Sequence, residues 1–326
     1  MKRKTLGLLA LVTGVALAGC AGGAPGPTGS ESAGAATGAP EVSTITVGTL
    51  PFANLAAFYH AVEAGYFTDE GLDVEVVLAS SGPQQISSLV AGDIQITSSN
   101  YVSALQGIAQ GLPLELVRES DLGGIEGIYT LPDSGIESAK DLVGRTLAVN
   151  AIGNVQSLTA SSLVDADGGD ASGVQFVELP PPNMLAALEQ GQVDAAWMSD
   201  PFATLGMTTA GIVRIADAWS GPNDGLGPSG WASTTQFADA NPNAVAAFNR
   251  AMDRATADVL EDPSIVAEVV PTFTQVTPEA AASLAPINWV LKSDLHKQLG
   301  GWQELMLKYG ALDAEVDLDA VIFPGS

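Results

Sequence analysis

The segment MLAALEQGQVDAAWMSDPFA, residues 184–203, contains a helix, a strand and the start of a second helix. Its first part has the apolar spacing of a helix, and residues 193–199 form an apolar run typical of a buried strand. Asp200 follows that strand, and Pro201 cannot continue a ladder but can begin a helix. Helices that alternate with strands build mostly parallel sheets. The segment therefore predicts an α/β fold and leaves open whether Asp200 is catalytic, binds a ligand or caps the next helix.

The same alternation extends in both directions along the chain. Further strands are predicted at 43–50, 72–79, 94–99, 114–119, 127–132, 146–150, 173–179 and 212–217, with helices at 54–64, 84–92, 100–110 and 154–165. From residue 231 onward the pattern becomes helical, with helices expected over 242–260, 263–271, 278–287 and 293–309. This order predicts two lobes, each a mostly parallel sheet flanked by helices, and a C-terminal helical tail that returns to the first lobe.

Two crossings of the chain separate the predicted lobes. We place lobe 1 at residues 43–128 and 232–326, and lobe 2 at residues 129–231. Ligands of open parallel sheets bind beyond the carboxyl ends of the strands. The cleft between the two lobes is therefore the predicted binding site.

The N-terminal residues have the features of a bacterial export signal. Three basic residues at positions 2–4 precede an apolar run over 6–18, which is too short to span a bilayer. The run ends in Leu-Ala-Gly-Cys, which resembles a lipobox, so residues 1–19 are predicted to be a lipoprotein signal peptide and Cys20 the lipidated residue. A chance cysteine in a signal peptide is the alternative. Because the sequence contains one cysteine, it predicts no disulfide and no cysteine-based metal site.

The chain after the signal peptide is a polar tether followed by an acidic domain. Residues 20–42 are rich in Gly, Ala, Pro, Ser and Thr and predict a flexible tether between the lipid and the folded part. Without residues 1–19, nine basic residues face 37 acidic ones, a net charge of −28. This charge argues against nucleic acid, which requires a basic surface. No later run is long enough to span a membrane, so we expect attachment to the outer face of the cytoplasmic membrane through the lipid alone.

Four blocks resemble the substrate-binding proteins of ABC importers, in the group that serves nitrate, taurine, alkanesulfonates and thiamine-pyrimidine precursors. They are AFYHAVEAGYFTDEGLDVEVV (57–77), LVAGDIQITSS (89–99), DLVGRTLAVN (141–150) and MLAALEQGQVDAAWMSDPFA (184–203). The resemblance implies the type II periplasmic-binding-protein fold, a small-molecule ligand, and an ABC permease with its ATPase as partners. It also implies hinge closure of the two lobes around the ligand. We expect a monomer without a cofactor.

The ends of the predicted strands supply the candidate ligand contacts. They are Phe52, Asn54, Gly82, Gln84, Ser98, Ser99 and Asn100 in lobe 1, and Gly153, Asn154 and Asp200 in lobe 2. Trp231 is added because it lies at the return crossing, where an aromatic ring could clamp a ligand, whereas Trp197 is expected in the core. Each helix start alone is typical of a plain cap, but their convergence on one cleft favours ligand binding.

Catalytic residues are poorly represented in this sequence. His60 and His296 are the only histidines; His60 is expected on the exposed surface, and the two are predicted to lie far apart. We expect no second carboxylate at the cleft beside Asp200, so an acid–base pair is lacking. No cluster of His and Cys is available to bind a metal. The chain is therefore predicted not to be an enzyme and to hold no metal.

These features predict capture of a small polar organic solute outside the cytoplasmic membrane for an ABC importer. Serine and asparagine with backbone N–H groups suit a sulfonate, a carboxylate or a ring oxygen, and Asp200 suits an amine or a ring N–H. A taurine- or alkanesulfonate-like solute and a pyrimidine-like solute both remain open. The alternatives are a lyase on the same two-lobe fold, with Asp200 as its base, and a lipoprotein that senses or adheres.

Overall fold

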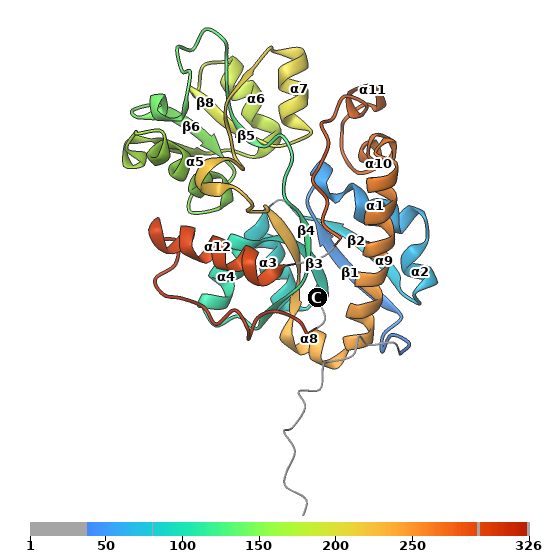
Figure 1. The fold of residues 1–326 in the computed structure, drawn as a ribbon. Helices are drawn as coiled ribbons and strands as arrows, with labels where there is room; N and C mark the ends of the chain where they lie inside the picture. The colour runs from blue at the N-terminus through green and yellow to red at the C-terminus, as the bar shows by residue number, and fades with distance from the viewer. Residues whose placement is uncertain (1–37, 80, 292–293, 325–326) are drawn as a thin grey trace, which may run out of the picture. The chain divides into compact units, whose positions relative to one another are not determined.

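The computed structural model describes residues 38–79, 81–291 and 294–324. The predicted signal peptide, Cys20 and most of the predicted tether lie outside these residues. Two sheets of five strands each, covered by helices, account for the strands of the described chain (Figure 1). This arrangement confirms the predicted α/β fold with two lobes.

The first sheet has the strand order β2-β1-β3-β10-β4. Its strands are β1 (Thr44–Thr49), β2 (Asp73–Leu78), β3 (Ile96–Asn100), β4 (Leu114–Asp121) and β10 (Ser229–Thr234). β1 pairs in parallel with β2 and β3, while β10 is antiparallel to both β3 and β4. The parallel part of the sheet thus comes from consecutive strand–helix units, and the antiparallel strand comes from the distant return of the chain.

The second sheet repeats this plan with the order β7-β6-β8-β5-β9. Its strands are β5 (Gly127–Thr130), β6 (Thr146–Val149), β7 (Gln175–Glu178), β8 (Ala195–Met198) and β9 (Val213–Asp217). β6 is parallel to β7 and β8, and β5 is antiparallel to β8 and β9. Each sheet is therefore mostly parallel with one antiparallel strand at the fourth position.

The helices follow the strands along the chain. In the order of the sequence they are α1 (Ala56–Glu63), α2 (Tyr66–Asp69), α3 (Gly82–Ala91), α4 (Tyr101–Ala109), α5 (Val155–Ala166), α6 (Pro181–Glu189), α7 (Phe202–Thr209), α8 (Thr235–Ala240), α9 (Pro242–Glu261), α10 (Ser264–Phe273), α11 (Pro278–Ala281) and α12 (Leu295–Lys308). The C-terminal helices return to the first lobe as predicted, because α9 packs on α1 and β4, and α12 packs on α4.

An aromatic core fixes α1 and α9 against the first sheet. The ring of Phe58 lies 5.0 Å from that of Trp231, and Phe248 of α9 lies 5.1 Å from Trp231 between centroids. All three side chains are fully buried. Burial of one large apolar side chain contributes roughly 1.5–3 kcal/mol, so each of the three stabilises the packing of α1 and α9 on the first sheet.

The two crossings between the sheets comprise residues 122–126 and 218–228. They differ from the predicted boundaries, which divide β5 at residue 128 and β10 at residue 231, although each strand joins one sheet as a whole. Trp219, in the second crossing, makes edge-to-face contacts with Trp197 and Trp302, at 6.3 Å between centroids in each case. The second crossing is therefore packed against both lobes.

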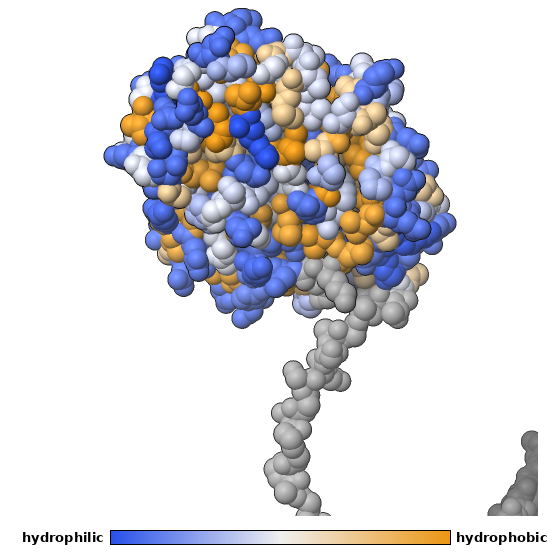
Figure 2. Space-filling model, turned by 45° about the horizontal axis from the view of Figure 1, so that its top comes forward, coloured by the Kyte–Doolittle hydropathy of each residue, from blue (hydrophilic) through white to orange (hydrophobic). Residues whose placement is uncertain are grey.

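Hydrophilic residues cover most of the face drawn in Figure 2, with apolar residues gathered toward its middle and one side. The net charge of the full chain is −25. Among the residues that the structure describes, no helix is both long and apolar enough to cross a membrane.

Candidate functional site

A cavity lies at the carboxyl ends of strands from both sheets. Its walls come from the segments that follow β1, β3, β6 and β8, from the first crossing, and from the start of β10. The empty space measures about 860 Å³ with its open mouth and the adjoining solvent included. The predicted location of the binding site between the lobes agrees with this cavity.

Seven of the eleven predicted contacts line the cavity. They are Phe52, Asn54, Ser98, Ser99, Asn100, Asn154 and Asp200. These residues come from four separate strand ends, so the fold brings together side chains that are up to 148 positions apart in the sequence. Strand ends were thus an effective guide to the walls of the site.

The other four predicted contacts lie elsewhere. Trp231 is fully buried between Phe58 and Phe248, because β10 is an inner strand and directs this side chain into the core under α1 and α9. Gly82 does not line the cavity but lies close to the wall residue Asn100, because a Cβ built at Gly82 would lie 2.6 Å from Nδ2 of Asn100. Gln84 is exposed on α3, and the carbonyl of Gly153 accepts a hydrogen bond from Nε2 of Gln106 at 3.0 Å.

Asp200 lies two residues after β8; it caps the next helix and also lines the cavity. Its Oδ1 accepts a hydrogen bond from the main-chain N–H of Thr204 at 3.0 Å, which satisfies a donor in the first turn of α7. The same residue lines the cavity and is 9 % exposed. Burial raises the pKa of the Asp200 carboxyl, and hydrogen bonds from Thr204 and Ala285 partly offset that effect. Capping and exposure to a ligand are therefore compatible at this position.

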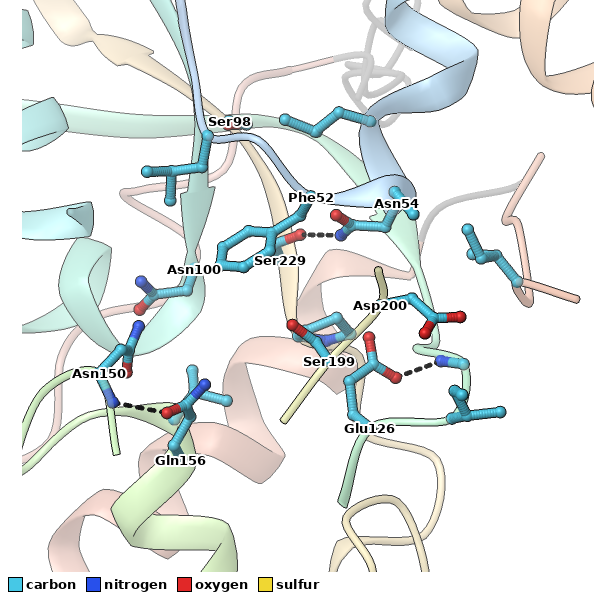
Figure 3. A pocket seen from close by; sticks show the side chains of 18 of the residues that line it. Phe52, Asn54, Ser98, Asn100, Glu126, Asn150, Gln156, Ser199, Asp200 and Ser229 are labelled. Carbon is cyan, nitrogen blue, oxygen red and sulfur yellow. Dashed lines mark hydrogen bonds between the residues drawn. The ribbon is translucent and has the colours of Figure 1, made fainter. Parts of the chain in front are cut away.

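Glu126 is a second carboxyl at the cavity, contrary to the expectation that Asp200 has no partner there. It lies in the first crossing and is 8 % exposed. Its Oε2 accepts hydrogen bonds from the main-chain N–H of Gly124 and, at 2.9 Å, from the indole Nε1 of Trp219. Burial raises the pKa of Glu126, and the negative charge of Asp200 raises it further. Figure 3 shows both carboxyls on the same side of the cavity.

A third acid, Asp121, lies directly behind the wall at the end of β4. It is fully buried, and its pKa is raised to about 7, first by burial and then by the charge of Glu126. Its Oδ2 accepts a hydrogen bond from Nδ2 of Asn54 at 3.0 Å, and the hydroxyl of Ser229 lies 3.3 Å from the same nitrogen. Asp121 therefore orients Asn54, which was predicted to be a ligand contact, with capping of a helix as the alternative.

The asparagines at the starts of α4 and α5 act as caps. Oδ1 of Asn100 accepts from the N–H of Ser103 at 2.8 Å, and Oδ1 of Asn154 accepts from the N–H of Val155 at 2.8 Å. Nδ2 of Asn154 also donates to the hydroxyl of Ser103 at 2.9 Å, which joins lobe 2 to lobe 1. Both residues thus act as helix caps, and Asn154 also links the two lobes.

Neither histidine reaches the cavity. His60 is half-buried rather than exposed, and its Nε2 lies 2.9 Å from Oδ2 of Asp258 on the outer side of α9. His296 pairs with Asp319 at 2.9 Å. In the part of the chain that the structure describes, no group of three or more His, Cys, Asp and Glu side chains is placed to hold a metal ion.

Residues 53–265 match the family model described as NMT1/THI5 like. The chain belongs to this family. The match covers most of both lobes and includes the ends of β3, β6 and β8, which contribute to the cavity.

Two relatives of the chain carry names that refer to binding of solutes. The chain is 25 % identical to a putative aliphatic sulfonates-binding protein of Bacillus subtilis, over 97 % of this chain and 94 % of that one. It is 24 % identical to the taurine-binding periplasmic protein of Escherichia coli, over 70 % of this chain and 68 % of that one. An enzyme also matches: a 4-amino-5-hydroxymethyl-2-methylpyrimidine phosphate synthase of Aspergillus parasiticus is 24 % identical, over 65 % of each chain.

Solved structures share the fold of this NMT1/THI5-like chain. The alkanesulfonate-binding protein SsuA from Xanthomonas axonopodis, bound to MOPS, superposes with a TM-score of 0.73 at 18 % identity, covering 86 % of this chain and 98 % of that one. The nitrate-binding protein NrtA from Synechocystis superposes with a TM-score of 0.77 at 16 % identity, covering 88 % of each. These likenesses establish the periplasmic-binding-protein fold.

Sequence reasoning missed Glu126 because it follows no strand end. The segment ESDLGGIEG, residues 119–127, contains three acids among glycines at a crossing between lobes, and this was the available signal. Asp121 was missed because β4 was expected to end at residue 119, whereas the structure extends it to Asp121.

Proposed function

We propose that this protein is an extracytoplasmic solute-binding protein of an ABC importer. It captures a small polar organic solute in the cavity between its lobes, closes around it, and delivers it to a permease with its ATPase. The single observation that carries this proposal is the cavity itself, in which the strand ends of both sheets and the first crossing place carboxyls, amides and Phe52 around one space. The names of the sulfonate- and taurine-binding relatives agree with this function.

A screen of melting temperature tests the capture function. The purified protein is heated with taurine, alkanesulfonates, nitrate, pyrimidines or flavins, with sodium sulfate at equal ionic strength as the control. A ligand present at a hundred times its dissociation constant adds roughly 2.7 kcal/mol to the free energy of unfolding, and this raises the melting temperature. If none of the compounds changes the melting temperature relative to the control, the proposed ligand class is wrong.

A lyase on the same fold is the second candidate, and one specific observation favours it. Glu126 and Asp200 are two buried carboxyls with raised pKa values at one cavity, which is a common arrangement for acid–base catalysis. Mass spectrometry of the protein after overnight incubation with each bound compound separates the two functions. A binding protein returns its ligand unchanged, whereas a lyase produces a new mass.

We also propose that Cys20 carries a lipid that anchors the protein to the outer face of the cytoplasmic membrane. The basic residues, the apolar run and the Leu-Ala-Gly-Cys sequence support this anchor. When the full chain is expressed in a bacterium, the N-terminal peptide should begin at residue 20 and carry the added mass of a diacylglyceryl group. The variant C20S should be released from the membrane. A mature N-terminus elsewhere, without added lipid, would contradict this proposal and favour an ordinary signal peptide.

A further inference from the structure

We infer that the cavity selects its ligand by positive charge or by N–H donors. An ammonium, an amidinium or an N–H-bearing heterocycle binds to Glu126 with Asp200 nearby, and a plain alkanesulfonate or nitrate is rejected. This inference rests on the proposed function, because it names the chemical class of the solute that the same cavity captures.

The charges at the cavity all have one sign. Glu126 and Asp200 are the only charged side chains among the residues that line it, and none of the lining residues is Lys, Arg or His. The buried Arg118 of β4 is already bound to Asp253, so its charge is committed elsewhere. An anionic ligand would therefore lose its hydration without gaining a cationic partner.

Glu126 is held so that one carboxyl oxygen is available to a ligand. The N–H groups of Gly124 and Trp219 both donate to Oε2, which fixes the orientation of the side chain and leaves Oε1 as an acceptor. Figure 3 shows the carboxyl of Glu126 directed toward the cavity beside Ser199. A ligand that donates a hydrogen bond to Oε1 therefore meets a group that is already oriented.

Two amides of the wall, those of Asn54 and Asn150, add acceptors, whereas the side-chain oxygens of Asn100 and Gln156 already accept main-chain N–H groups. Nδ2 of Asn54 donates to Asp121 and Ser229, so its carbonyl oxygen is the atom left for a ligand. Asn150 also lines the cavity, and its buried Oδ1 accepts no hydrogen bond from the described residues. A buried acceptor without a donor is costly, and a ligand N–H would satisfy it.

Two matched pairs of probes test the inference by isothermal titration calorimetry on the full mature protein. Benzamidine and benzenesulfonate share a ring and differ in charge, while taurine and isethionate differ in an ammonium group that is replaced by a hydroxyl. We expect benzamidine and taurine each to bind at least tenfold more tightly than its partner. Equal or tighter binding of the anion in either pair would refute the inference.

Failure of this inference and failure of the proposed function give different results. If none of the four probes binds, the charge selection is refuted, but solute capture stands as long as the wider screen finds a ligand. If the screen also finds none, the capture function itself fails. A tightly bound alkanesulfonate would preserve capture and overturn the selection.

Isosteric variants test whether Glu126 and Asp200 are the residues that select cationic ligands over anionic ones. E126Q should weaken the binding of benzamidine at least tenfold without weakening benzenesulfonate, and D200N should change the ratio in the same direction. E189Q removes a carboxylate from an exposed position of α6 and should leave the ratio unchanged. If E126Q does not fold, the binding ratio of D200N alone tests the charge selection. Retention of the wild-type ratio in a folded E126Q or D200N protein would refute the assignment for that residue.

Discussion

Asp121 illustrates how one buried residue sets the geometry of its neighbours. It touches no part of the cavity, yet its carboxyl accepts hydrogen bonds from Asn54 and Gly123 and thereby orients a wall residue. The pKa of about 7 implies that this carboxyl is largely protonated in weakly acidic solution. At higher pH the carboxyl is charged, and the cost of burying that charge then offsets the stabilisation from the hydrogen bonds that it accepts.

We expect the contribution of Asp121 to the free energy of unfolding to fall as the pH rises from about 4 to 7. Because the pKa of Asp121 is raised above its usual value of 3.8, the folded protein binds a proton more tightly than the unfolded chain over that interval. This contribution decreases until the pH has passed about 7, and it does not change further above that pH. Urea denaturation of D121N at several pH values should show a smaller slope than the wild type.

The control for D121N is D133N, which removes a negative charge from an exposed residue. It allows for the general effect of charge in a protein with a net charge of −25. Equal pH slopes for D121N and the wild type would show that Asp121 does not titrate in this interval.

At the scale of elements, the sequence was informative wherever a strand is followed directly by a helix. The pattern of apolar residues correctly predicted β1 to β3 and α9, and α9 has the buried apolar face that its period indicates. It could not predict the orientation of Trp231, because this depends on pairing of β10 with β3 and β4, more than 100 residues earlier. Glu126 was not predicted for the same reason, since the contacts of a crossing segment depend on the packing of both sheets.

The contact between α3 and α4 supplies a prediction at this scale. G82A would place a methyl group 2.6 Å from Nδ2 of Asn100 and 2.9 Å from the hydroxyl of Ser103, which together cap α4 and join it to lobe 2. We expect a loss of about 1–3 kcal/mol in the free energy of unfolding, because these capping groups must shift.

Gly300 provides the matched control within helix α12. A Cβ at this position meets its nearest atom at 4.0 Å, so G300A should stabilise the protein by roughly 0.5–1 kcal/mol through helix propensity alone. Urea denaturation measures both variants. Stability of G82A equal to or above the wild type would contradict the tight contact between α3 and α4.

At the scale of the whole described domain, the lobes are joined by more than their crossings. Val155 and Leu158 of α5 belong to the same apolar cluster as residues of α4 and α12. Asn154 and Gly153 add hydrogen bonds to Ser103 and Gln106 on the same side. The order of strands and helices could predict two lobes, but not these contacts, because they depend on side chains from opposite lobes meeting at one edge of the cleft.

The indole of Trp219 connects the candidate site to both lobes at once. It donates to the carboxyl of Glu126, and its ring meets Trp197 in lobe 2 and Trp302 in α12. Indole emission depends on nearby charge and hydrogen bonding, so neutralisation of Glu126 by a bound cation alters the surroundings of a natural fluorophore. The protein thus contains its own optical reporter of occupancy, and a titration can be followed by intrinsic fluorescence without any label.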